Sequence, residues 1–299
     1  MTLLSKFRAL ARRRRTELSW ALRLKMPPWR RRSLDVWSVA GGLGDELMAL
    51  SVVQAASQKA PSCKLTFHAR HMSLMPASTD GLLIVPYQQE TIPAGSIGLM
   101  YLQRHRLAIV EQMALQMGLR LSEHTTSLPR RPPEELPSSF PKDAPAVVMQ
   151  TVASAWTPNK QWPKEYWQQM IELLAPDIAV LEVGTESVFD QPPAHPRFRS
   201  LVGRTTMPQF AACIQEAAVF VGPPSGGMHV AHAYQVPSVV VIGGYEGTYP
   251  YPLARQFYSP VPCAPCWLRT DCPYDKKCLR QITPAMVRDA IKKTLDAIS

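Results

Sequence analysis

The sequence has 299 residues, 46% hydrophobic and 19% charged, which is enough apolar material for one large or two medium cores. No apolar run approaches the roughly 18 residues that a bilayer span requires. The basic N-terminus lacks the apolar core and small-residue cleavage site of a signal peptide, so we expect a cytoplasmic protein.

The formal net charge of +10 is concentrated at the N-terminus. Residues 1–34 contain eleven Lys or Arg and one acid, Glu17, whereas the remaining 265 residues contain 22 bases and 22 acids. A neutral body argues against a broad basic face for duplex nucleic acid, and we expect no nucleic-acid partner. The pattern instead indicates that residues 1–33 form a separate, positively charged extension that binds by electrostatic attraction.

This basic extension has helical spacing up to Lys25, and Pro27 and Pro28 end it. Its apolar residues near one face are Leu3, Phe7, Leu10, Leu18, Ala21 and Leu22. Trp20 and Trp29 stand where interfacial residues are found. We expect a basic helix that binds an anionic membrane surface, peripherally on the inner membrane face. A solvated, partly disordered tail and a nucleic-acid contact are the alternatives.

Strands and helices then alternate on both sides of a proline-rich stretch. Before it we predict strands at 34–40, 63–69 and 82–87, and helices at 46–57 and 105–119, the latter ending at Gly118. Residues 128–145 contain six prolines and no periodicity, which predicts a linker. Beyond it we predict strands at 146–150, 178–184, 218–222 and 237–244, and helices at 163–174, 207–217, 225–234 and 283–298.

This alternation predicts an α/β protein with two doubly wound, Rossmann-like domains that face each other across a cleft. The first domain would span 34–127 and the second 146–299. In such sheets, ligands bind beyond the carboxyl ends of the strands.

The stretch AGGLGDEL (40–47) places Gly42, Gly44 and Asp45 between a strand and a helix. Glycines let the backbone turn sharply and approach a ligand. Asp45 has two interpretations, a helix N-cap or a carboxylate that acts as a general base.

Two charged residues follow predicted strands of the second half. Lys160 lies between a strand end and a helix start, where a lysine reaches a phosphate or simply lies in solvent. Glu186 follows the strand 178–184, where an acid commonly accepts ribose hydroxyls or caps a helix.

The stretch VGPPSGGMHVAHAYQVPSVVVIGG (221–244) has backbone-specialised residues at one strand end. Ser225, Gly226 and Gly227 begin a helix, so their N–H groups would cradle a diphosphate. His229, one turn in, would donate to a phosphate oxygen. His232 is interpreted as a packed, structural histidine.

Four of the six cysteines cluster in a loop-rich segment, 263–278. Cys263, Cys266, Cys272 and Cys278 have spacings of x2, x5 and x5. Thiolates bind zinc in tetrahedral sets, so a structural zinc is one interpretation. Reduced thiols, a redox-dependent disulfide and an iron–sulfur cluster are the others.

Six motifs in order resemble glycosyltransferase family 9, the ADP-heptose:lipopolysaccharide heptosyltransferase type, over residues 34–298. They are GLGDELMALSVVQA, NKQWPKEYWQQMIELL, VGTES, GRTTMPQFAACIQEA, VGPPSGGMHVAHAYQVPSVVVIGG and CLRQITPAMVRDAI. The resemblance implies the two-domain GT-B fold and an inverting, metal-independent sugar transfer from a nucleotide sugar to a lipopolysaccharide or another surface glycan.

The resemblance also implies residue roles. Asp45 aligns with the proposed catalytic base, Lys160 with a lysine on the donor diphosphate, and Glu186 with the acid on the donor ribose. Ser225, Gly226 and His229 align with the phosphate-binding segment. Where the family usually has an acid just before that segment, this sequence has Pro224.

Three further functions are compatible with the sequence. The GGLGD turn also resembles the glycine-rich loop of GDP-fucose transferases, which carry out a different sugar transfer. A nucleotide-sugar epimerase or hydrolase of the same architecture is a second possibility. A catalytically silent nucleotide-binding scaffold is a third.

Overall fold

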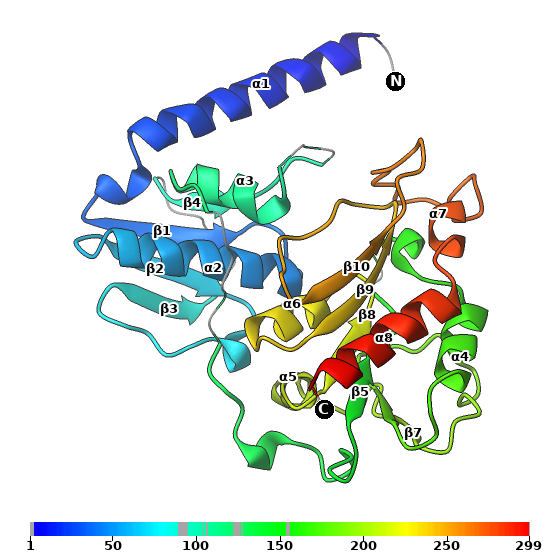
Figure 1. Cartoon of the computed structure of the whole chain (residues 1–299). Helices are drawn as coiled ribbons and strands as arrows, with labels where there is room; N and C mark the ends of the chain where they lie inside the picture. The colour runs from blue at the N-terminus through cyan, green and yellow to red at the C-terminus, as the bar shows by residue number, and fades with distance from the viewer. Residues whose placement is uncertain are drawn as a thin grey trace. The chain divides into compact units, whose positions relative to one another are not determined.

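The computed structural model describes residues 3–88, 95–103, 105, 107–121, 126, 128–153 and 156–298, with only the backbone of residues 3–10. The chain forms two compact units, residues 1–126 and 127–299. Both units are built on a parallel sheet with helices in its connections (Figure 1). The prediction of an α/β protein with two doubly wound parts is confirmed.

The first unit has a parallel sheet in the order β3-β2-β1-β4. Its strands are β1 (Ser33–Ser38), β2 (Lys64–Ala69), β3 (Leu82–Pro86) and β4 (Ile97–Leu99). The helix α2 (Leu43–Lys59) connects β1 to β2, and α3 (Ile109–Gln116) follows β4 (Figure 1). Short 3-10 helices occupy Pro28–Arg30 (η1) and Met72–Leu74 (η2).

The basic extension is helix α1 (Leu3–Lys25), and it packs against the first unit through Trp20. The Trp20 ring is buried and meets the His105 ring edge-on at 5.5 Å between centroids. His105 Nε2 lies 3.1 Å from the Glu17 carboxylate, one turn before Trp20. The expectation that Trp20 is an interfacial residue is therefore wrong, because its ring fills a contact inside the unit.

The second unit has a six-stranded parallel sheet in the order β10-β9-β8-β5-β6-β7. Its strands are β5 (Ala146–Met149), β6 (Ala179–Glu182), β7 (Phe198–Ser200), β8 (Val219–Gly222), β9 (Ser238–Gly243) and β10 (Ala254–Tyr258). Its helices are α4 (Lys164–Glu172), α5 (Met207–Gln215), α6 (Gly226–Ala233), α7 (Lys277–Arg280) and α8 (Pro284–Ile298), and its 3-10 helices are η3 (Pro133–Glu135) and η4 (Pro158–Lys160).

The four central strands of this sheet, β5, β6, β8 and β9, are buried along their whole length. Continuous apolar strands are what a parallel sheet covered on both faces requires. The core also includes Trp162 and Trp167, whose rings meet edge-on, and Val287 and Ile291 of α8. The second unit therefore offers a rigid platform for residues at its strand ends.

The proline-rich stretch 128–145 lies within the second unit. The backbone N–H of Arg131 donates to Gln215 Oε1, and Gln215 Nε2 donates back to the Arg131 carbonyl. Leu128 and Phe140 are buried. Although it contains only one short 3-10 helix, this stretch is thus fixed to α5.

The predicted elements differ from the structure mainly where strands are short. β4, β7 and β10 were not predicted, because three to five residues give too little alternation to detect. The predicted helix 105–119 is only Ile109–Gln116, and Gly118 follows its end with a positive φ of 69°. The residues GGLGD (41–45), between the predicted strand 34–40 and helix 46–57, form a shorter turn than expected, because α2 already begins at Leu43.

Candidate functional site

The strand order of each sheet marks where a ligand is expected. In the second unit the chain proceeds from β5 to β6 and β7 on one side, and then returns to place β8 on the other side of β5. In the first unit, the same reversal occurs between β1 and β4. Ligands bind at such switch points, beyond the carboxyl ends of the strands. Both glycine-rich stretches directly follow a switch-point strand, β1 or β8.

Gln150 and Ser225 face each other across the switch point of the second unit. The Ser225 hydroxyl donates to Gln150 Oε1 at 2.9 Å, and Gln150 Nε2 donates to the Val152 carbonyl. A Cβ on Gly227 would lie 2.6 Å from Gln150 Oε1 and from the Phe220 ring, so any other residue would force these side chains to shift. Gln150 was missed by sequence analysis, although its place at a strand end was a usable signal.

Ser225 is the N-cap of α6, but its side chain makes no capping bond to the helix. The hydroxyl is held by Gln150 instead. The first-turn N–H groups, which include those of Gly226 and Gly227, are thus not capped by this side chain. A helix N-terminus of this kind favours an anion through its N–H groups and partial positive charge.

Lys160 is held in place at this helix start rather than lying in solvent. Its ammonium group donates to the Pro224 carbonyl at 3.2 Å and lies 2.9 Å from Glu246 Oε1. It also lies 5.1 Å from the centre of the Tyr245 ring. The side chain is 16% exposed, and that of Glu246 only 3%. Lys160 is a positioned cation whose tip is fixed beside the residue before Ser225.

Glu246 is the carboxylate that sequence analysis missed. It follows β9, the strand next to β8, and reaches Lys160 from that side. The family acid expected at position 224 is replaced in sequence by Pro224, yet the structure supplies a buried carboxylate from another strand end. The signal was available, because Glu246 lies just beyond a predicted strand.

His229, in the first turn of α6, forms a buried hydrogen-bonded pair with Tyr251, which lies between β9 and β10. Nδ1 of His229 and the Tyr251 hydroxyl oxygen are 2.6 Å apart. Burial raises the pKa of Tyr251 and, with smaller contributions from His232 and Lys160, lowers the pKa of His229 to about 3. A protonated tyrosine that donates to Nδ1 favours a neutral histidine with its proton on Nε2. His229 can therefore donate one hydrogen bond through Nε2.

His232, in the next turn, is a packed residue as predicted. Its ring stacks on Tyr251 with 3.7 Å between centroids and an interplanar angle of 8°. It is 7% exposed. This stacking fixes the Tyr251 ring and, through it, the hydrogen bond to His229.

Glu186 lies beyond β6 on the other side of β5, and its side chain is exposed. It makes no hydrogen bond or ion pair with a described residue, so its carboxylate is available to a ligand. Four residues earlier, Glu182 is buried and accepts bonds from the hydroxyls of Thr151, Ser187 and Ser200. These three bonds make Glu182 a structural carboxylate that ties β6 to its neighbours.

The cysteine-bearing segment supports the loop that carries Lys160. The Asn159 amide donates to the carbonyls of Leu268 and Thr270, and the Thr157 hydroxyl donates to Leu268 as well. Cys266 N–H donates to the Gly244 carbonyl just past β9. A Cβ on Gly244 would lie 3.2 Å from that of Cys278, so the segment packs closely on this strand end.

The four clustered cysteines are all free thiols in the structure. Burial raises the pKa of the Cys278 thiol, and Cys266 and Cys272 add to this effect. Among the residues that the structure describes, no three His, Cys, Asp or Glu side chains are arranged to hold a metal ion. Cys266 and Cys272 lie close enough to Cys278 to act on its pKa, but the placement of the four described cysteines does not make a metal site.

In the first unit, Gly42 is the N-cap of α2, and Gly44 and Asp45 lie in the first helical turn. Asp45 is half-buried and is not the cap. A Cβ on Gly42 would lie 3.0 Å from Asp45 Oδ2, so the glycine leaves room for this carboxylate. The first turn of a helix stabilises an ionised aspartate.

The next residue, Glu46, is fully buried and holds the loop after β2. Its carboxylate accepts from the backbone N–H groups of Arg70 and His71 and lies 2.5 Å from His71 Nδ1. These bonds lower the pKa of Glu46 despite its burial, which alone would raise it. Glu46 therefore fixes the carboxyl end of β2 to the start of α2, beside Asp45.

A protein-family model described as glycosyltransferase family 9 (heptosyltransferase) matches residues 87–272, more than half of the chain. No curated protein matches the sequence. The resemblance inferred from the six motifs is therefore confirmed at the level of the family.

Solved structures of similar fold include three bacterial sugar transferases. The iron-containing dodecameric glycosyltransferase TibC from enterotoxigenic E. coli H10407 has a TM-score of 0.72 and 18% identity, covering 90% of this chain and 77% of TibC. The E. coli ADP-heptose lipopolysaccharide heptosyltransferase II has a TM-score of 0.65 and 16% identity, covering 89% and 99%. E. coli WaaC with ADP-2-deoxy-2-fluoro heptose has a TM-score of 0.54 and 15% identity, covering 88% and 99%. At these identities, the likeness shows a shared fold.

Proposed function

Because this chain belongs to glycosyltransferase family 9 and is a glycosyltransferase, we propose that it transfers a sugar from a nucleoside diphosphate sugar with inversion at the anomeric carbon. The observation that carries this proposal is the buried cluster at the switch point of the second unit, where Lys160, His229 and the start of α6 surround one strand end. The ammonium group of Lys160, the N–H of His229 and the N–H groups at the start of α6 are all suited to bind a diphosphate.

On the donor side, we assign Lys160, His229 and the α6 N–H groups to the diphosphate. Lys160 supplies a point charge, and neutral His229 supplies one N–H from Nε2. Glu186, exposed beyond β6, would accept the ribose hydroxyls. Glu246 acts through Lys160, whose ammonium group it fixes; it is a positioning residue.

In the transfer step, Asp45 would take the proton of the acceptor hydroxyl as this oxygen attacks the anomeric carbon. The bond from the anomeric carbon to the diphosphate breaks, and its electron pair leaves with the diphosphate. A positioned base contributes roughly 10²- to 10⁴-fold, and losing one donor to the leaving group costs about 10²- to 10³-fold in rate. These residues perform the transfer without a metal in the chemical step.

For the substrates, we propose that the donor carries a heptose-like sugar or a hexose, and that the acceptor is a lipopolysaccharide or another surface glycan. Support comes from solved structures of similar fold: TibC was determined in complex with ADP-D-β-D-heptose, and WaaC with an ADP-linked fluoro-heptose. The base of the nucleotide is assigned by analogy with these two, as adenine.

We also propose that α1 rests on an anionic membrane surface. Leu18, Leu22 and Met26 repeat every four residues and are 69%, 55% and 59% exposed. The exposed side chains of Arg14 and Arg15 lie near the same face, opposite the buried Trp20. Among the described residues, no helix is both long and apolar enough to cross a membrane.

The cysteine segment is proposed as a structural brace rather than a catalytic part. Zinc is the metal that its sequence favours, and the iron of TibC adds a second candidate. A metal would require the four thiols to turn toward one another from their present placement. Its effect would reach the site through Asn159, which holds two carbonyls of this segment.

The test is turnover with and without acceptor. The protein is incubated with ADP-heptose, or with GDP-, UDP- or dTDP-sugars, in the presence or absence of acceptor glycolipid. Acceptor-dependent release of nucleoside diphosphate is expected with at least one donor. Conversion of the donor without acceptor would indicate an epimerase or hydrolase instead. Binding of a nucleotide sugar with no turnover would indicate a silent scaffold, the alternative that Pro224 keeps open.

A further inference from the structure

A cavity of about 520 Å³ lies in the first unit, at the edge of the sheet opposite Asp45. It is lined by Arg23 and Met26 at the end of α1, the residues Pro27, Pro28, Arg30 and Arg31 before β1, and Gly95, Ser96 and Ile97 at the start of β4. These residues precede β1 and begin β4, whereas Gly42 and Asp45 follow β1. The cavity is therefore separate from the proposed acceptor-side residues.

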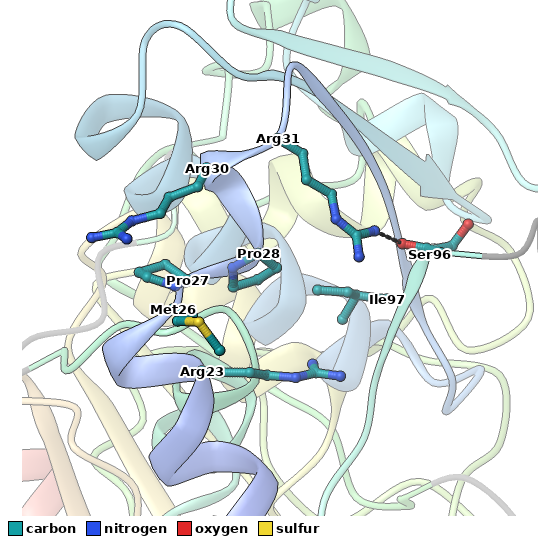
Figure 2. Close-up of a pocket in the computed structure, with 9 residues that line it drawn as sticks. Arg23, Met26, Pro27, Pro28, Arg30, Arg31, Ser96 and Ile97 are labelled. Carbon is teal, nitrogen blue, oxygen red and sulfur yellow. Dashed lines mark hydrogen bonds between the residues drawn. The ribbon is translucent and has the colours of Figure 1, made fainter.

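The lining combines cations with apolar surface and contains no acid. Figure 2 shows the guanidinium groups of Arg23 and Arg31 on the same side of the Pro27–Pro28 turn with Ile97 between them, whereas Arg30 points away. Like charges in one cavity repel unless an anion lies between them. An anion is thus the ligand that this pair favours.

The two arginines are held but not neutralised by the residues that the structure describes. Arg31 donates through Nη1 to the Gly95 carbonyl at 2.8 Å, and Arg23 donates through Nη1 to the Gln116 carbonyl at 2.8 Å. Neither forms an ion pair with a described residue. A guanidinium has five N–H donors, so each retains donors for a ligand. Burial lowers the pKa of Arg23, and the charge of Arg31 lowers it further.

We propose that Arg23 and Arg31 bind a phosphate group in this cavity. Two arginines that present forked N–H donors from fixed positions suit a phosphate, which accepts through several oxygens. The floor formed by Pro28 and Ile97 is apolar, and exposed Met26 belongs both to the cavity and to the Leu18–Leu22–Met26 stripe of α1. This continuity fits a lipid phosphate whose chains lie along the stripe, and free phosphate is the other source of the same group.

The test measures how fast phenylglyoxal modifies each arginine of the full-length protein. Peptide mass spectrometry gives the extent of modification at each position. Inorganic phosphate is the first probe, and Arg32 is the internal control, because it adjoins Arg31, is exposed and does not line the cavity. Phosphate is expected to protect Arg23 and Arg31 and to leave Arg32 unprotected. Equal reactivity of Arg31 and Arg32 at every phosphate concentration would overturn the proposal.

Variants then measure the contribution of Arg31. In Arg31→Gln, the phosphate concentration that half-protects Arg23 should rise about tenfold, the loss expected for one charge-assisted hydrogen bond. Arg32→Gln removes the same charge and should change nothing. Arg31→Lys keeps the charge without the fork and should lie between them. Equal effects of Arg31→Gln and Arg32→Gln would show that phosphate responds to the overall positive charge and not to a specific site, which would contradict the proposal.

Vesicles distinguish the two sources of phosphate. Phosphatidylcholine vesicles that contain phosphatidic acid are compared with vesicles of equal surface charge that contain oleic acid. Protection of Arg23 and Arg31 by phosphatidic acid but not by oleic acid assigns a lipid phosphate. Protection by inorganic phosphate with neither vesicle active assigns a soluble phosphate. No donor sugar or acceptor takes part, so the result is independent of the proposed transfer reaction.

Discussion

The ammonium group of Lys160 lies 2.9 Å from Glu246 Oε1; the Glu246 side chain is buried and that of Lys160 is mostly covered. Lys160 follows β5 and Glu246 follows β9, so the contact brings together the ends of two strands separated by β8. The same ammonium group donates to the Pro224 carbonyl, just before Ser225. Glu246 thus restrains a cation where the proposed donor diphosphate would bind.

We first predict that Lys160→Ala slows sugar transfer by about 10²- to 10³-fold, because it removes a cation from the leaving group. Lys164→Ala is the matched control. This exposed lysine lies in the first turn of α4, away from the proposed site, and pairs with Asp190. It should transfer sugar normally. Steady-state kinetics with varied donor measures both, and equal rates for the two variants would remove Lys160 from the donor site.

Glu246→Gln should destabilise the fold and raise KM for the donor more than it lowers kcat. Removing one partner of a buried ion pair costs about 3–5 kcal/mol, because the other charge stays buried and unpaired. The double variant Lys160→Met/Glu246→Gln should recover most of that stability without recovering activity. Urea unfolding gives the free energy of unfolding of each variant, and steady-state kinetics gives KM and kcat. Full stability of Glu246→Gln, with unchanged KM, would contradict the positioning role.

Asp45→Asn should preserve the fold and donor binding but lower turnover by at least about 10²-fold, as expected for loss of a general base. The side chain is half-buried in the first turn of α2, where asparagine fits the same space. Glu46 is not a suitable control, because its carboxylate is structural. Single-turnover rates at saturating donor measure the step, and near-normal turnover would exclude Asp45 as the base.

Folding stability should fall as the pH is lowered below about 6.5, in part because of His229. An unfolded histidine has a pKa of about 6.5, whereas burial lowers the pKa of His229 to about 3 in the folded protein. Between these values only the unfolded chain binds the proton, so its population is favoured by up to about 1.4 kcal/mol per pH unit. Above about pH 6.5, where histidine is neutral in both states, His229 no longer lowers the stability.

The check is chemical unfolding of the wild type and of His229→Asn between pH 7.5 and 5. The variant should show the smaller loss of unfolding free energy over that range. His195→Asn, in the same unit, controls for the loss of a histidine as such. Parallel curves for wild type and His229→Asn would show that His229 does not titrate this way.

Membrane binding should depend on the exposed face of α1. Leu18→Ser, Leu22→Ser and Met26→Ser together should reduce co-sedimentation with anionic vesicles, because each removes apolar surface from the interface. The matched control replaces Leu253, Tyr274 and Met286, which are 45%, 54% and 42% exposed in the second unit. If both triple variants bind vesicles as the wild type does, α1 is not the contact.

Protein purified without chelator should contain about one zinc or iron per chain if the cysteine segment binds a metal, one of the interpretations of its sequence. Cys272→Ser should then lose the metal and lower the melting temperature. Cys213 is the internal reference for thiol titration, since burial raises its pKa to about 12 and keeps it unreactive. Metal content well below one, with all four clustered thiols reactive in the folded protein, would end this prediction.

The α/β class and most long elements could be predicted from the sequence, because apolar periodicity and glycine or proline boundaries are local properties. Lys160, Ser225 and His229 could also be placed beside strand ends, from which their proximity follows once the sheet is parallel. Short strands such as β4, β7 and β10 could not be found, because their pairing partners, not their own residues, define them.

The partners of these residues, in contrast, depend on the order of the strands in the sheet. The contacts of Lys160 with Glu246, of Ser225 with Gln150 and of His229 with Tyr251 join different strand ends, and no single segment encodes the sheet order that creates them. The same holds for Trp20, whose sequence position indicated a membrane interface but whose ring is buried against His105. Burial depends on what packs around a side chain, and a local pattern does not contain that information.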